Sequence, residues 1–189
     1  DVYSWNWIIP APTPFQNPDC WLPLGPPSAN DTALFALPLP NTVVFSSNVT
    51  NRQLTVRAGS YDFDLNDRTY RLTDDESVVV GDTIMDPSLR LLDGTLSGVE
   101  GRVGVGNSAN RGLVTVGAAG QAAVWTNTGG LYIGEAGKGT LNVVNGSVSN
   151  TTGVLGYAGG SVGTVTVRGT ARPGRTRPVS MSETPVRVR

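Results

Sequence analysis

Four consecutive segments between Val78 and Gly169 share one pattern of glycine and aliphatic residues. Each has an aliphatic run that ends in Gly, a short polar turn, and alternating aliphatic residues that end at a further Gly. The glycines that close the first runs are spaced roughly 22 to 28 residues apart, a period typical of stacked supersecondary units. They are Gly81, Gly106, Gly134 and Gly156. The chain is therefore predicted to be a repeat array.

This pattern favours an all-β fold, a parallel β-solenoid (β-helix) in which each coil buries inward-facing side chains against the coils above and below. The corners of such a coil need residues that tolerate positive φ, and Gly and Asn supply them. In the segment LYIGEAGKGTLNVVNGSVSN, a bend is predicted at Asn145. Leu141 and Val143 before this bend and Val148 after it are the predicted inward positions.

The composition agrees with a turn-rich β-structure and argues against two classes of partner. The 189 residues include 24 Gly and 13 Pro, and 14 Lys and Arg nearly balance 15 Asp and Glu. The resulting net charge of −1 gives no field that would attract nucleic acid or an anionic membrane. No apolar run approaches the roughly 20 residues that a membrane helix needs. We expect no nucleic-acid binding and no membrane insertion of this segment.

Two residue types that often carry chemistry are scarce. The single cysteine, Cys20, excludes an internal disulfide, and the lack of His removes the commonest metal ligand and general base. No acidic run has the ligand spacing of a calcium loop. We expect no catalytic residue, no cofactor and no metal.

Because the chain begins with Asp rather than Met, we expect a mature or excised form.

Residues 1–40 differ in texture from the rest of the chain. They concentrate prolines and hold three of the four tryptophans, Trp5, Trp7 and Trp21. Proline cannot donate to a strand ladder, so a loop-rich N-terminal cap is predicted here, followed by a solenoid domain over residues 41–169. The tryptophans either cover the open end of the solenoid or form a platform that stacks on sugars.

Two aspartates form the one carboxylate pair that strand periodicity places on a common face. In SYDFDLNDR, alternation puts Tyr61, Phe63 and Leu65 on one face and Asp62 and Asp64 on the other. A glycosidase needs two carboxyl groups across one bond, so this pair is the candidate for glycan contact. The alternative is that both are solvent-facing residues of an exposed strand.

The segment AVWTNTGGLYIGEAGKGTLNVVNG resembles the repeats of large secreted bacterial surface proteins of the autotransporter-passenger and PEP-CTERM-associated type. The pattern of those repeats is Trp-Thr-Asn, then Leu-x-Val/Ile-Gly, then Gly-x-Leu-x-Val. The residues that match it are Trp125, Thr126, Asn127, Leu131, Ile133, Gly134, Gly139, Leu141 and Val143. The repeat segment continues to VTVRG at residue 169, and the stretch DTALFALPLPNTVVFSSNVTNRQLTVRAGSYDFDLNDRTYRLT resembles the leading section that commonly precedes such repeats. Together the two stretches cover most of residues 31–169, and the resemblance implies a secreted, cell-surface β-strand array but no activity.

Residues 170–189, TARPGRTRPVSMSETPVRVR, depart from the pattern and carry five arginines. Read from the third base of the Thr170 codon, with suitable third bases, this tail encodes GSTWTNSAGLYVGNAGSGT, which parallels AVWTNTGGLYIGEAGKGT. We interpret the tail as a frameshifted repeat, with a basic arm as the alternative. A coil without a capping unit exposes unpaired backbone groups, so self-association through the last coil is predicted.

The array without a catalytic constellation predicts a non-catalytic structural or adhesive segment of a secreted bacterial surface or matrix protein. The alternative is a β-helix that binds or degrades extracellular polysaccharide. In that case the contacts would come from Trp5, Trp7, Trp21, Asp62 and Asp64.

Overall fold

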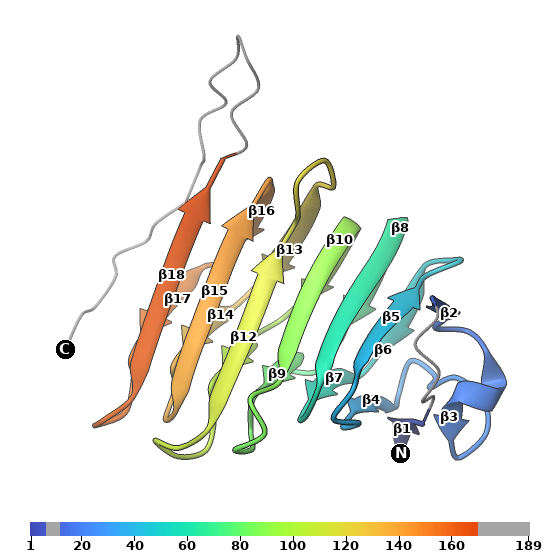
Figure 1. Ribbon diagram of the computed structural model, residues 1–189, viewed down its shortest axis with the longest axis horizontal. Helices are drawn as coiled ribbons and strands as arrows, with labels where there is room; N and C mark the ends of the chain where they lie inside the picture. Colours follow the sequence, from blue (N-terminus) through green and yellow to red (C-terminus); the bar gives the residue numbers. More distant parts are fainter. Residues whose placement is uncertain (7–11, 170–189) are drawn as a thin grey trace, which may run out of the picture.

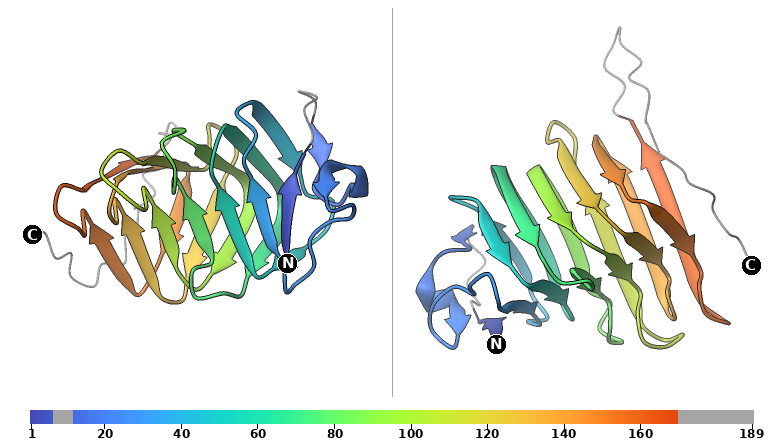
Figure 2. Two further views of the ribbon diagram at one scale, coloured as in Figure 1. Left: turned by 90° about the horizontal axis from the view of Figure 1, so that it is seen from below. Right: turned by 180° about the vertical axis from the view of Figure 1, so that it is seen from behind.

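A computed structural model describes residues 1–6 and 12–169, and it confirms the predicted parallel β-solenoid. About six turns are stacked along one axis, as Figure 1 shows. Strands take up 57% of the chain, and the described residues contain no α-helix. The two ends of the described chain lie at opposite ends of the stack (Figures 1 and 2).

A full coil has three sides, and each side continues in register from one coil to the next. The strands of the first side are β1 (Val2–Trp5), β4 (Thr32–Phe35), β7 (Gln53–Val56), β9 (Val78–Val80), β11 (Gly101–Val103), β14 (Gly130–Ile133) and β17 (Thr152–Leu155). The strands of the second side are β2 (Thr13–Pro14), β5 (Pro40–Val44), β8 (Ser60–Leu72), β10 (Ser88–Gly98), β12 (Arg111–Val116), β15 (Lys138–Val144) and β18 (Val162–Arg168).

The third side is formed by shorter strands and by the second halves of two long ones. β8 and β10 pass the corner without ending, so their C-terminal halves pair on this side with the short strands. The short strands are β6 (Val49–Asn51), β13 (Ala123–Asn127) and β16 (Gly146–Ser149). Residues with positive φ make the corner: Asn66 and Asp67 in β8, Asp93 in β10, and Asn145 between β15 and β16. The predicted bend at Asn145 is therefore confirmed.

The core is a set of ladders in which equivalent inward residues of successive coils lie one above another. The alternation predicted for β8 is confirmed, since Tyr61, Phe63 and Leu65 are almost completely buried. Leu141 and Val143 are also buried, and Val148 is partly buried against the same core. One ladder on the second side consists of Val43, Phe63, Leu91, Val116, Val143 and Val167.

Aromatic rings fill the core near the N-terminus, whereas aliphatic side chains fill it near the C-terminus. Phe35 contacts four rings, with centroid distances of 5.5 Å to Trp5 and Trp21, 4.9 Å to Tyr61 and 5.0 Å to Phe63. The pair with Trp5 is stacked and the other three are edge-to-face, and both arrangements add to the gain from burial alone. The ladders of β15 and β18 contain Leu and Val instead.

The N-terminal segment closes its end of the stack, as a cap should, but the stacking begins earlier than residue 41. β1 and β4 already pair in parallel with each other, and β4 pairs with β7. The closing elements are the 3-10 turn η1 (Pro18–Cys20) and β3 (Trp21–Leu22), which runs antiparallel to β1. Proline density did not prevent strands here, because Pro40 begins β5 and Pro14 lies in the edge strand β2.

The strand register corrects one of the four predicted corner glycines. Val103 pairs with Val80 on one side and with Ile133 on the other, so Gly104 is the residue equivalent to Gly81 and Gly134. Gly106, which the sequence pattern suggested, lies two residues later in the following loop. Both glycines have positive φ, +73° for Gly104 and +97° for Gly106, so spacing alone could not distinguish them.

Candidate functional site

Two of the three tryptophans of the platform expected as one alternative are not available for ligand contact. Trp5 and Trp21 are 2% and 0% exposed, and their ring centroids lie 5.1 Å apart in an edge-to-face pair. The Trp21 Nε1 donates to the Phe15 carbonyl oxygen at 2.8 Å. Both indoles are part of the core because they cover the first coils, which is the other alternative that the sequence left open. Trp7 lies outside the described residues.

The main candidate site is an open groove of about 540 Å³ on the outer face of the second side. It crosses β5, β8, β10 and β12, whose outward residues are aligned by the parallel register. The outward polar side chains that line it are Thr42, Ser60, Asp62, Ser88, Arg90 and Thr115, whereas Asn41, in register with the inward Tyr61, is buried. The residues that line this groove include no aromatic ring. It therefore offers hydrogen-bonding groups but no surface for stacking on a sugar face.

The charged centre of this groove is an ion pair between successive coils. Both oxygens of Asp62 accept from Arg90, at 2.9 Å from Nε to Oδ1 and through Nη2 to Oδ2. These hydrogen bonds raise the pKa of Arg90. Arg90 follows Asp62 by 28 residues, one coil of the array, so the repeat period was the signal that could have paired them. Sequence reasoning identified Asp62 but missed its partner.

Asp64, the second carboxylate of the predicted pair, makes a different contact. The Asp64 Oδ1 accepts from the backbone N–H of Asn66 at 3.1 Å, which fixes the turn at the corner of β8. Asp62 and Asp64 share a face as predicted, but each carboxylate already has its own partner. This arrangement does not provide the free acid and base that glycoside hydrolysis requires.

We expect the substitutions Asp62→Asn and Arg90→Gln to change the free energy of unfolding by less than about 1 kcal/mol each, because both side chains are partly solvent-exposed. Urea denaturation of the two variants and of the double variant measures this. A coupling well above about 1 kcal/mol would show that the pair is a structural element of the stack rather than a surface contact.

A second charged cluster lies on the outer face of the first side, centred on Arg102. Its guanidinium contacts Glu135 at 2.8 Å and Glu76 and Glu100 at 3.2 Å, and it lies 5.4 Å from the centroid of the Tyr132 ring. Burial lowers the pKa of Arg102, but the three carboxylates outweigh it and raise the value overall. These residues come from consecutive coils, so the cluster ties the stack together. Nothing in the sequence indicated it.

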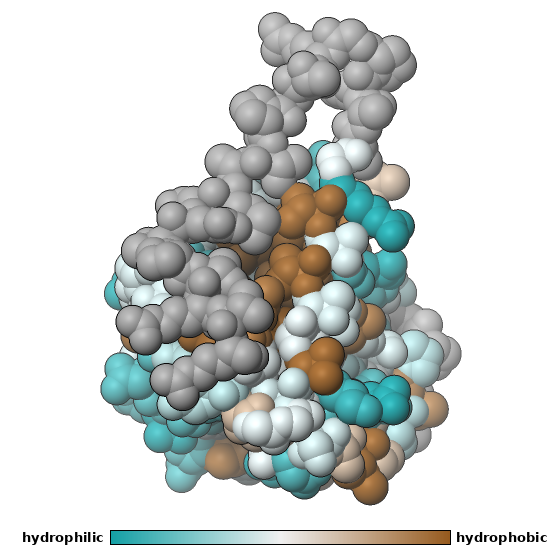
Figure 3. Space-filling model, turned by 90° about the vertical axis from the view of Figure 1, so that its left-hand side faces the viewer, coloured by the Kyte–Doolittle hydropathy of each residue, from teal (hydrophilic) through white to brown (hydrophobic). Residues whose placement is uncertain are grey.

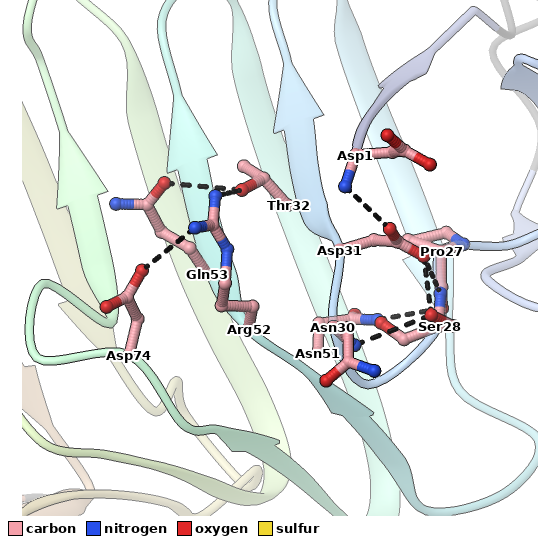
Figure 4. Close-up of polar contacts among 10 residues, drawn as sticks. All are labelled: Asp1, Pro27, Ser28, Asn30, Asp31, Thr32, Asn51, Arg52, Gln53 and Asp74. Carbon is pink, nitrogen blue, oxygen red and sulfur yellow. Dashed lines mark hydrogen bonds and ion pairs between the residues drawn. The ribbon is translucent and has the colours of Figure 1, made fainter.

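A polar network joins the first coils at the N-terminal end (Figure 4). The Asn51 Nδ2 donates to the carbonyl oxygens of Pro27 and Ser28, each at 2.8 Å. Asp31 accepts from the backbone N–H of Ser28 at 2.9 Å and from its hydroxyl at 2.5 Å, and pairs with the Asp1 amino group at 2.9 Å. The network fixes the loop before β4; among its groups, the buried Asn51 Oδ1 has no hydrogen-bond partner in the described part of the chain.

Arg52 extends this network into the next coil. Its Nη2 donates to the Thr32 hydroxyl at 3.0 Å, and its Nη1 lies 3.7 Å from the Asp74 carboxylate (Figure 4). The Arg52 and Asp74 side chains are 49% and 35% exposed. Arg52 therefore links residues of neighbouring coils at the surface, where such pairs contribute little to stability.

The Asp31 contacts predict a specific loss of stability in acid. The hydrogen bond from the Ser28 hydroxyl, followed by the hydrogen bond from the Asp1 amino group, lowers the pKa of Asp31 from 3.8 to about 2. A carboxyl with a depressed pKa contributes stability above its unfolded-state pKa, and this contribution is lost as the pH falls through the folded-state value. We expect Asp31→Asn to lower the urea midpoint near neutral pH and to weaken its decline between about pH 4 and 2.

The matched control is Asp75→Asn, because Asp75 is exposed at the surface. Urea midpoints of the wild type and the two variants near pH 7, 4 and 2 measure the contribution. Equal pH profiles for all three proteins would contradict the assignment to Asp31.

The other side chains that could take part in a reaction or bind a metal are buried or lie far apart. Cys20 is buried, and burial followed by the charge of Asp19 raises the pKa of its thiol, which disfavours the reactive thiolate. Burial raises the pKa of Tyr61 to about 12 and that of Tyr70 as well.

In residues 1–6 and 12–169, no three Cys, His, Asp or Glu side chains are grouped to hold a metal ion. No helix in this described part has the length and apolar character to cross a membrane.

Comparison of the chain with protein-family models, with curated proteins and with solved structures finds no match. The class defined here is therefore that of the fold itself, a three-sided parallel β-solenoid.

Proposed function

We propose that this chain is a non-catalytic structural or adhesive segment of a secreted bacterial surface or matrix repeat protein. The observation that carries the proposal is where the repeat motif lies. Trp125, Leu131, Ile133, Leu141 and Val143 are all buried, so the repeated residues serve the stacking of coils. Repetition that maintains a core supports a role in which length and rigidity matter, as in a stalk or spacer.

The outer surface supports the same proposal. Its charged residues are largely paired with one another between coils, as at Asp62 with Arg90 and at Arg102 with Glu135. Short hydroxyl and amide side chains such as Thr115, Asn142 and Thr166 continue the outward ladder. A surface of this kind gives a stiff, hydrated rod whose sides are available for weak polar contacts.

The test is antibody labelling of cells that produce the protein. An antibody raised against residues 12–169 is expected to label intact cells or their extracellular matrix without permeabilisation. Labelling that requires permeabilisation would contradict the proposed localisation. Adhesion is tested separately with beads that carry the chain, whose retention under flow on cells and on mineral or polymer surfaces is compared with that of albumin-coated beads.

A second candidate function is the binding of an extracellular polysaccharide along the groove on the second side. The observation that favours it is the open groove of about 540 Å³ with hydroxyl and charged groups from four coils. Parallel register spaces these groups regularly at about 4.8 Å, which suits an extended polymer better than a compact ligand.

A glycan array together with an assay for new reducing ends distinguishes the two candidates. The structural proposal predicts no release of reducing ends from any polysaccharide. Binding that is lost in Asp62→Ala and Arg90→Ala, but retained in the exposed control Asp75→Ala, would establish the groove as a binding site. Release of reducing ends that depends on Asp62 would overturn the non-catalytic proposal.

A further inference from the structure

The last coil exposes side chains that are buried in every preceding coil. Leu141 and Val143 in β15 are 3% and 5% exposed, whereas Val165 and Val167, which pair with them in β18, are only partly buried. Figure 3 shows hydrophobic side chains gathered on this end of the molecule. The C-terminal end therefore presents the cross-section of the core.

The corner glycines show that this end has room for another coil. A Cβ added at Gly104 or Gly134 would lie 2.4 or 2.2 Å from the backbone of the following coil, which passes directly over these residues. Gly156 is the equivalent residue, since it follows Leu155 as Gly134 follows Ile133, and its φ is +64°. In the described chain, the nearest atom to its added Cβ is an oxygen of its own coil, Ser161, at 3.5 Å.

The opposite end of the solenoid is closed, which makes the two ends unequal. β3 runs antiparallel to β1 and ends the first side, and Pro14 in β2 presents no N–H at the edge of the second side. Trp21 covers the core there with 0% exposure. In the described part of the chain, no comparable element lies on β16, β17 or β18.

The shape of the last coil specifies what fits on it. In the last three coils of the first side, Leu131 lies between Gly101 and Gly153, so a large side chain fills the space beside each small residue. A coil placed on β17 would thus put a large residue over Gly153 and an aliphatic one over Leu155. With suitable third bases, the other frame of the tail encodes GSTWTNSAGLYVGNAGSGT, which supplies Leu-Tyr-Val-Gly at the positions over residues 153–156.

We propose that the C-terminal end of the solenoid is an interaction surface for one further coil of the same type, seated in parallel register on β16, β17 and β18. Its occupant is the segment with the sequence GSTWTNSAGLYVGNAGSGT. Its backbone would pass over Gly156 and pair with the edges of β17 and β18 that no other described strand occupies. This surface follows from the coil geometry, whatever the cellular role of the solenoid.

The experiment compares the full chain with an extended chain, in which residues 170–189 are replaced by this segment followed by LNVVNG, the sequence of residues 141–146. The control carries the same added residues in scrambled order. In a repeat array, each correctly seated coil adds its own interface to the total stability. We expect the extended chain to have a Tm higher than that of both other proteins by about 5 °C or more.

Gly156→Ala identifies the position of the added coil. The positive φ strains alanine equally in both backgrounds, but only the extended chain would bring backbone over this residue. We expect Gly156→Ala to lower the Tm of the extended chain by about 5 °C more than that of the full chain. Equal losses in the two backgrounds, or no gain of the extended chain over the scrambled control, would overturn the proposal.

Light scattering distinguishes the alternative occupant, a second copy of this chain. The added coil ends in the same open edges, so it also permits association; we expect instead that the gain in Tm is independent of protein concentration, as for an intramolecular contact. End-to-end dimers that persist in the extended chain without any gain in Tm would assign the surface to a second copy and overturn the proposal.

Discussion

Gly134→Ala is expected to lower the free energy of unfolding by about 3 kcal/mol or more. The residue has a φ of +73°, where an L-residue is strained by about 1 to 2 kcal/mol. Its added Cβ would also lie 2.2 Å from the Val162 carbonyl oxygen, at the start of the strand of the next coil. Relief would require β18 to move away from β15, which would disturb the whole parallel ladder between them.

Gly120→Ala is the matched control for this prediction. Gly120 has a φ of +81°, but no described atom lies within 4 Å of an added Cβ. Its cost should therefore be the backbone strain alone, about 1 kcal/mol. Thermal and urea unfolding of both variants isolate the effect of coil stacking as the difference between them. Equal destabilisation by the two substitutions would show that the next coil does not press on Gly134.

Phe35→Ala is expected to destabilise the protein by about 3 to 5 kcal/mol, the range for a fully buried large ring. Phe35 is 0% exposed and contacts Trp5, Trp21, Tyr61 and Phe63, so its removal leaves a cavity that rigid neighbouring rings cannot fill. The same loss of packing should change the near-ultraviolet circular dichroism of the tryptophans. Urea unfolding followed by both signals measures the prediction.

The control for this substitution is Tyr157→Ala. Tyr157 is 66% exposed and packs against one ring, that of Tyr132, with the two ring centroids 6.2 Å apart. We expect it to change the free energy of unfolding by less than about 1 kcal/mol. A loss for Phe35→Ala no larger than that of Tyr157→Ala would mean that the aromatic cluster does not stabilise the N-terminal coils.

The periodic part of the fold could be predicted from sequence because two local rules govern it. Alternation along a strand assigned Tyr61 and Phe63 to the core, and the tolerance of Asn for positive φ placed the bend at Asn145. The glycine position in the second repeat was wrong because Gly104 and Gly106 both satisfy the local rule. Only the pairing of Val103 with strands in two other coils distinguishes them.

Features that depend on contacts between coils were harder to predict. The burial of Trp5 and Trp21 follows from their place over the first coil, which composition does not reveal. Arg90 was not recognised as the partner of Asp62, since a ladder contact joins residues a full coil apart whose spacing varies from coil to coil. Asp62 was therefore identified as a site residue without the ion pair that determines its chemistry.

Because the core changes from aromatic to aliphatic side chains along the stack, the N-terminal coils are packed differently from the C-terminal coils. Each coil contacts only its neighbours, so local unfolding should begin at the C-terminal coils, where packing is weakest, and advance one coil at a time towards the N-terminus. Amides of β17 and β18 are expected to exchange with deuterium first and those of β8 last. If the chain leaves a ribosome or a secretion channel with its N-terminus first, the aromatic N-terminal coils, which form the most stable folding nucleus, would thus be the first to fold. Every later coil would then add to a template that already exists.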